Sequence, residues 1–95
     1  MIGVIARNYV RLEQMDEFIK IASALVEETR KEAGCTIYTV FRNVENETLT
    51  FMEIWDDKQS LNLHLKSDHF IKYAGMLETL QYEKTKLEIF DDRCL

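Results

Sequence analysis

The spacing of hydrophobic residues changes along this chain, and this change constrains the fold more than any other feature. In residues 2–10 apolar side chains alternate, so that Val4 and Ala6 share one face while Ile5 and Tyr9 share the other. Alternation of this kind is typical of a β-strand, and apolar residues on both faces indicate that both are at least partly covered.

Residues 14–32 follow a helical period instead. The apolar stripe of this predicted helix contains Met15, Phe18, Ile19, Ala22, Leu25, Val26 and Thr29. Charged residues lie mostly off the stripe, as expected for a helix that buries one face. Gly34 follows at a position where a left-handed residue would end the helix.

Two further strands are predicted over residues 35–43 and 48–56, which are rich in β-branched and aromatic residues. The polar segment 44–47 joins them as a hairpin connection. A helix capped by Asp56 or Asp57 should then carry Leu61 and His64 toward the core.

Ser67 and Asp68 interrupt this second helical region as a turn and a new N-cap. A second helical piece is predicted from about residue 69 to residue 80, followed by a last strand over residues 82–90. The charge of that strand favours a position at the sheet edge.

The order βαββαβ predicts an α+β, ferredoxin-like domain with an antiparallel sheet and helices on one face. The chain has no proline and no Gly/Ser linker, so we expect residues 1–95 to form a single domain. The other sheet face also carries apolar residues and needs a cover. We therefore expect a homodimer that pairs through the sheets.

Net charge excludes several classes of partner. With a formal charge of −5, the chain lacks the basic surface that nucleic acids or anionic membranes attract. No stretch approaches the ~20 apolar residues of a membrane span, and residues 1–10 do not resemble a signal peptide. We expect a cytoplasmic protein.

Polar residues that interrupt apolar strand faces are candidates for function, because buried polar groups must be paired. Asn8 shares a face with Val4 and Ala6, and Glu53 shares one with Phe51 and Trp55. A carboxylate beside the only tryptophan could have a raised pKa and act as an acid or base. The alternative is a Glu53 that is open to water or paired with a cation.

His64 and His69 are the only histidines, and the two cysteines, Cys35 and Cys94, show no paired spacing. On one continuous helix, imidazoles five positions apart would diverge by about 140°, whereas a bend would allow them to meet. No third ligand follows from the spacing, so we expect no metal site. His64 faces inward and is either a general acid/base or a packing residue, while His69 is expected near the surface at the start of a helix.

The chain resembles the antibiotic biosynthesis monooxygenase family over essentially its whole length. The resemblance rests on "EFIKIASALVEETRKEAGC", on E-x-W at residues 53–55 and on "HLKSDHF" at residues 64–70. It implies a ferredoxin-like protomer that dimerises into an α+β barrel. It also implies oxidation of a small phenol or quinol by O₂, in a pocket between the sheet and the second helical region, without a cofactor.

The resemblance also suggests site residues. His64 or Glu53 would be the catalytic acid/base, and Asn8 and the Trp55 N–H would orient the substrate. The remaining pocket lining would be Tyr38, His69, Phe70 and Tyr73. The partner would be a small aromatic or quinone-like ligand.

Other branches of the family leave alternatives open. A haem-degrading branch has a histidine ligand at the position that matches Ala74 here, which argues against haem. An isomerase of a small phosphorylated hydroxyketone would need a cationic site, for which Arg7, Lys66 and Lys72 are candidates. A dimer that binds a small ligand in a stress response, without catalysis, is the remaining alternative.

Overall fold

The computed structural model describes residues 1–94 and confirms the βαββαβ order, with the second helical region divided in two. The elements are β1 (Ile2–Val10), the 3₁₀ turn η1 (Leu12–Gln14), α1 (Met15–Thr29), β2 (Cys35–Arg42), β3 (Leu49–Trp55), α2 (Lys58–Leu65), α3 (Asp68–Glu78) and β4 (Gln81–Asp91).

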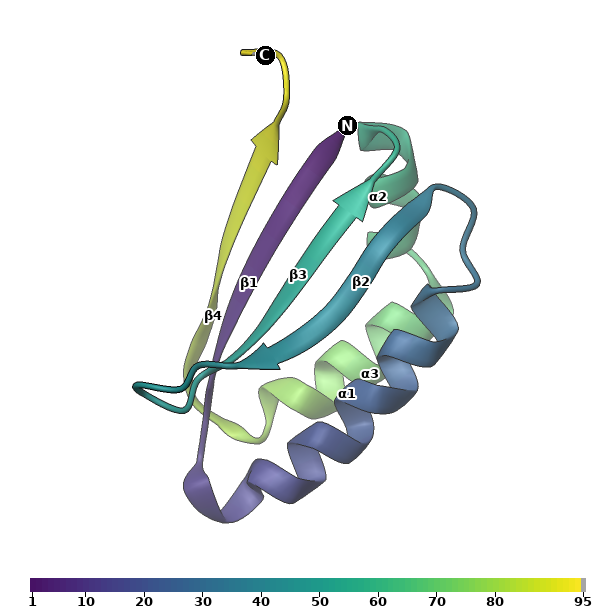
Figure 1. Ribbon diagram of the computed structural model, residues 1–95. Helices are drawn as coiled ribbons and strands as arrows, with labels where there is room; N and C mark the ends of the chain where they lie inside the picture. Colours follow the sequence, from purple (N-terminus) through teal and green to yellow (C-terminus); the bar gives the residue numbers. More distant parts are fainter. Residues whose placement is uncertain (95) are drawn as a thin grey trace.

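The strands form one antiparallel sheet in the order β2-β3-β1-β4. Figure 1 shows α1 and α3 lying across one face of this sheet, with α2 near the ends of β3 and β2. The predicted ferredoxin-like fold and the edge position of β4 are therefore confirmed. We call the face that the helices cover the inner face and the opposite one the outer face.

Strand alternation assigns side chains to these faces as predicted. Val4, Ala6 and Asn8 of β1 are buried on the inner face, where Phe18 and Leu25 of α1 pack against the sheet in the main core. Strand pairing places further inner-face residues in rows across the sheet. One such row consists of Tyr38, Glu53, Val4 and Ile89.

The helix predicted over residues 14–32 is shorter at its C-terminal end. It ends at Thr29, and residues 30–34 form turns instead. Gly34 does adopt a left-handed conformation, with φ of 83°, but at the entry to β2 rather than at the helix end. An added Cβ there would lie 2.2 Å from Ser60 Oγ. As a consequence, Glu32 lies in the turn after α1 and not in the helix.

The break in the second helical region has the predicted origin. Asp57 caps α2 by accepting a hydrogen bond from Ser60 N at 2.7 Å. Ser67 caps α3 by accepting one from Phe70 N at 3.3 Å. Side-chain oxygens of this kind satisfy N–H groups that have no partner within the helix. Two caps ten residues apart in sequence therefore produce two helices.

The outer face carries large apolar side chains that the chain itself leaves uncovered. Ile37, Phe41, Met52 and Phe90 are between 42% and 50% exposed.

Among the described residues, no helix is both long enough and apolar enough to span a membrane.

Candidate functional site

A cavity of about 460 Å³ lies on the inner face, between the sheet and the helices. Its volume is within the range of about 300–1,000 Å³ that small-molecule sites occupy. The walls are mainly apolar. Their apolar side chains include Val4, Ala6, Leu25, Phe51, Leu61, Leu65, Phe70, Leu77, Leu87 and Ile89. Leu87 and Ile89 on β4 are more than half exposed, so the cavity opens along the β4 edge.

The structure brings most of the predicted site residues to this cavity. Its lining includes Asn8, Tyr38, Glu53, His64 and Phe70.

Three predicted residues are not part of the lining. Trp55 is fully buried behind Glu53 and His64, and Tyr73 packs against the core. His69 is linked to His64 by the carboxylate of Glu32, which contacts both imidazole rings. Glu32 was not among the predicted site residues.

His64 is almost completely buried, with 1% of its side chain exposed. Its ring lies between aromatic rings, with centroid distances of 4.7 Å to Trp55, 4.9 Å to Phe70 and 5.2 Å to Tyr38. Burial lowers the pKa of His64, and a hydrogen bond and charge from Glu32 partly oppose this effect. A neutral imidazole that can accept a proton is therefore favoured.

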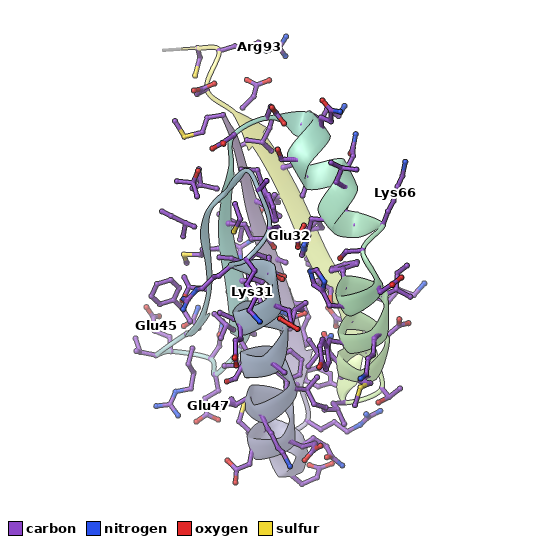
Figure 2. All side chains as sticks on the ribbon, turned by 90° about the vertical axis from the view of Figure 1, so that its right-hand side faces the viewer. Lys31, Glu32, Glu45, Glu47, Lys66 and Arg93 are labelled. Atoms are coloured by element: carbon purple, nitrogen blue, oxygen red, sulfur yellow. The ribbon has the colours of Figure 1, made fainter. Side chains whose placement is uncertain are left out.

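Glu32 is the carboxylate that joins the two histidines. Its Oε2 atom lies 2.7 Å from His64 Nδ1 and 2.7 Å from His69 Nε2. Figure 2 shows Glu32 at the end of α1, on the side of the α2–α3 pair, whereas Lys66 points outward. The capped break between α2 and α3 thus allows both imidazoles to reach one oxygen.

Glu32 is not among the residues predicted for the site, because it falls inside the helix predicted over residues 14–32. Glu32 instead belongs to the turn after α1, where its N–H donates to Thr29 O and its carbonyl accepts from Cys35 N. Gly34 is the sequence signal that indicates such a turn. No spacing in the sequence relates Glu32 to His64, which lies 32 positions further on.

These three side chains are also the candidate metal ligands among residues 1–94, since their ligating atoms lie within 4.8 Å of one another. However, contacts of 2.7 Å are the lengths of charge-assisted hydrogen bonds. Nitrogen and oxygen ligands around a zinc ion at about 2.0–2.2 Å must lie farther apart than this. A divalent cation would require Glu32 Oε2 to move away from both rings.

Glu53 is the second carboxyl group of the site. It is 7% exposed, and burial raises its pKa to about 7, although a hydrogen bond from Trp55 opposes the shift. Trp55 Nε1 donates to Glu53 Oε1 at 2.9 Å. Near neutral pH, Glu53 can therefore donate or accept a proton at the cavity wall.

Tyr38 lies beside Glu53 in the same row of the sheet. Burial, followed by the charge of Glu53, raises the pKa of Tyr38 well above its usual value. The hydroxyl group therefore keeps its proton at neutral pH and remains a hydrogen-bond donor.

Asn8 is held by hydrogen bonds within the protein. Its Nδ2 donates to Ala6 O at 3.1 Å and to Leu49 O at 2.9 Å. Its Oδ1 accepts from Thr85 Oγ1 at 2.8 Å and from Gln81 Nε2 at 3.3 Å. Asn8 lines the cavity as predicted, but both of its N–H groups are already used, and so is the N–H of Trp55.

Within the described part of the chain, two buried side-chain polar atoms lack a hydrogen-bond partner, Thr29 Oγ1 and His64 Nε2. Of these residues, His64 lines the cavity and Thr29 does not. Because buried polar groups are nearly always paired, the Nε2 atom of His64 stands out as a polar atom of a cavity-lining residue whose hydrogen-bonding capacity is unused.

Comparisons with known proteins agree with this fold. The family model described as "Antibiotic biosynthesis monooxygenase" matches residues 1–75. A structure of a conserved protein from Methanosarcina mazei Go1 superposes with a TM-score of 0.93 and 38% identity, covering 96% of this chain and 91% of that one.

Two curated relatives are similar in sequence. "Putative monooxygenase YcnE" of Bacillus subtilis is 30% identical over 70 residues, 70% of this chain and 74% of that protein. The Synechocystis protein sll1783 is 25% identical over 89 residues, 92% of this chain, and the match spans only 60% of its length. Because the family model covers most of the chain, this protein belongs to the antibiotic biosynthesis monooxygenase family.

Proposed function

We propose that this protein is a monooxygenase that oxidises a small phenol or quinol with O₂ and uses no metal or organic cofactor. The observation that carries the proposal is His64, a buried imidazole that lines an apolar cavity and whose Nε2 has no hydrogen-bond partner among the described residues. A neutral imidazole in this position is suited to take a proton from a substrate hydroxyl.

The shape and chemistry of the cavity support an aromatic substrate. Phe51 and Phe70 line it together with Tyr38, so flat apolar rings can pack against its walls. Exclusion of water by such walls strengthens electrostatic interactions with the anion that deprotonation creates. A polar sugar-like substrate would leave its hydroxyls largely unpaired here.

The reaction requires no external electrons, because the substrate supplies them. A phenol with a ring C–H para to its hydroxyl reacts with O₂ to give a quinone and water. One oxygen atom bonds to the ring carbon and the other leaves as water, with four electrons passing from the ring to O₂. His64 accepts the hydroxyl proton at Nε2, and the resulting phenolate is the species that reduces O₂.

Two cavity groups are available to stabilise the developing anion. Tyr38 keeps its hydroxyl proton, and Glu53 with a pKa of about 7 can donate a proton in its neutral form. Asn8 and Trp55 remain predicted substrate-orienting residues, but a ligand would have to displace hydrogen bonds that they already make.

We also propose that two copies pair through their outer faces. The exposed apolar side chains there, Ile37, Phe41, Met52 and Phe90, form the surface that such a dimer would bury. Light scattering tests this point. A single species of twice the chain mass is expected, which Met52→Lys should convert to protomers. A monomer at high concentration would contradict the dimer.

Oxygen uptake with a panel of phenols and hydroquinones, measured in the presence of a chelator and without added cofactor, tests the activity. His64→Gln and Glu53→Gln should each reduce the rate by about tenfold or more, with the fold checked by circular dichroism. Asn62→Ala is the matched control, because Asn62 is exposed on the same helix as His64.

Labelling with ¹⁸O₂ separates this reaction from simple oxidation. One labelled oxygen atom in the quinone supports the proposal, whereas hydrogen peroxide and an unlabelled product would overturn it. Ligand binding without oxygen uptake would favour the non-catalytic alternative. The phosphorylated-hydroxyketone isomerase is the weaker alternative, since the predicted cations Arg7, Lys66 and Lys72 are all absent from the cavity lining, and Lys84, which does line it, is exposed.

A further inference from the structure

We infer that Glu32 is the positioning residue of this site: it holds His64 in the tautomer that leaves Nε2 free, and it balances the charge of the ring once Nε2 is protonated. The assignment of the tautomer rests on the hydrogen-bond geometry around Glu32 and is independent of the proposed reaction. The catalytic consequence rests on the function proposed above, in which His64 is the base.

The tautomer follows from counting protons at Glu32 Oε2. Two ring nitrogens, His64 Nδ1 and His69 Nε2, each lie 2.7 Å from this single oxygen. An ionised carboxylate has only lone pairs to offer, so both nitrogens must carry a hydrogen. A neutral His64 with its proton on Nδ1 has a bare lone pair on Nε2.

Ser67 supports the protonation assigned to His69. The Ser67 hydroxyl donates to the carbonyl oxygen of His64 at 2.7 Å, so it offers a lone pair to other donors. His69 Nε2 lies 3.2 Å from this hydroxyl oxygen. Two acceptors, Ser67 Oγ and Glu32 Oε2, therefore lie near His69 Nε2. A hydrogen on this nitrogen can be shared between the two oxygens.

The charge near His64 also depends on Glu32. The titratable groups that face the ring come from the turn after α1, from β2, from β3 and from α3; they are Glu32, Tyr38, Glu53 and His69. Tyr38 is neutral, and Glu53 is ionised only in part near neutral pH because its pKa is about 7. Glu78 and Lys84 line the cavity on its exposed side. Glu32 is therefore the carboxylate in direct contact with the imidazolium that forms when Nε2 accepts a proton.

The proposed proton transfer conserves charge at the site. The substrate O–H bond breaks and an N–H bond forms at His64 Nε2, while the Nδ1–H bond to Glu32 remains in place. The resulting pair of imidazolium and carboxylate has no net charge. Burying this pair costs far less than burying an isolated imidazolium, which is why removal of the carboxylate should weaken the base.

Imidazole ¹H–¹⁵N spectra test the tautomer without any substrate. The chain has two histidines, and His69→Gln leaves the His64 signals to be identified. We expect His64 to be protonated at Nδ1 and unprotonated at Nε2 near neutral pH. In Glu32→Gln, the titration midpoint of His64 should move to lower pH.

The pH profile of oxygen uptake tests the catalytic consequence. In Glu32→Gln the rising limb of kcat/KM should move to lower pH, and its plateau should fall by about tenfold or more because a weaker base transfers protons less effectively. Glu32→Asp, which keeps the charge, should recover part of the rate. Glu28→Gln is the matched control, because it removes the same charge from a partly exposed residue that pairs with Lys31.

The outcomes separate this inference from the proposed function. If the spectra agree but no substrate consumes oxygen, the positioning role stands and the monooxygenase proposal fails. If oxygen uptake is found but Glu32→Gln changes neither the profile nor the titration, the positioning role fails alone. A His64 protonated at Nε2, or a tight 1:1 complex with Zn²⁺ or Co²⁺ that removes both N–H signals, would also overturn it.

Discussion

Asn8 and His64 are both buried polar residues on the same cavity, and they differ in how their polar atoms are satisfied. Asn8 uses its two N–H groups and its oxygen in four hydrogen bonds within the protein. His64 uses Nδ1 in a hydrogen bond with Glu32, but Nε2 has no partner among the described residues.

A buried polar residue can therefore serve either the fold or a ligand. The Asn8 side chain links β1 to β3 and to the first residues of β4, at the position where the register of β1 and β4 shifts. Such a group contributes to stability, because each of its bonds would be left unmade if it were removed. An unpaired buried polar atom lowers the stability of the folded protein. Binding of a ligand that forms a hydrogen bond with this atom recovers part of that free energy.

The largest effect on stability is expected at Asn8. Asn8→Ala removes the amide donor to two carbonyl oxygens and leaves Gln81 and Thr85 only their hydrogen bonds to each other, so the free energy of unfolding should fall by about 2–4 kcal/mol. Urea denaturation measures this change. Asn62→Ala makes the same substitution at an exposed site and should change it by no more than about 0.5 kcal/mol. Equal losses of stability at both sites would show that the hydrogen bonds of Asn8 do not stabilise the fold.

The second prediction concerns Glu53, which lines the same cavity as His64 and should make the free energy of unfolding depend on pH. Because the pKa of Glu53 in the folded protein is about 7, the folded state holds a proton that the unfolded chain releases at a lower pH. Stability should therefore fall as pH rises from about 4.5 to about 7, by about 2–3 kcal/mol from this group.

Glu53→Gln should remove this contribution, because the amide cannot ionise but can still accept the Trp55 N–H. Denaturant titrations at a series of pH values measure the slope. Glu45→Gln, in the connection between β2 and β3, removes an exposed carboxylate and should leave the wild-type slope in place. A Glu53→Gln variant with an unchanged slope would show that Glu53 titrates normally.

The smallest effect is expected at Thr85. Thr85→Val removes one donor to Asn8 Oδ1, but Gln81 Nε2 still donates to the same oxygen. The free energy of unfolding should fall by about 0.5–1 kcal/mol. If Thr85→Val costs as much as Asn8→Ala, the hydrogen bonds of Asn8 do not act separately, and the thermal unfolding of the double variant would measure their coupling.

Much of the site could be predicted from the sequence because strand alternation is a local property. It placed Asn8 and Glu53 on the buried face, and helical spacing turned His64 inward. The same reasoning failed at Glu32, because a run of charged residues at the end of a helix does not reveal where the helix ends. It left open whether a bend would bring His64 and His69 together, and the capped turn does bring both rings to one oxygen.

The order of elements, the apolar faces and the chemical groups on those faces follow from the amino-acid sequence, since each of these depends on neighbours within a few residues. Which of these groups meet depends on the tertiary structure. Glu32, His64 and Glu53 come from separate elements, and their contact depends on helix ends, caps and strand register acting together. A hydrogen bond requires positions accurate to a few tenths of an ångström, and residue spacing along the chain does not contain that information.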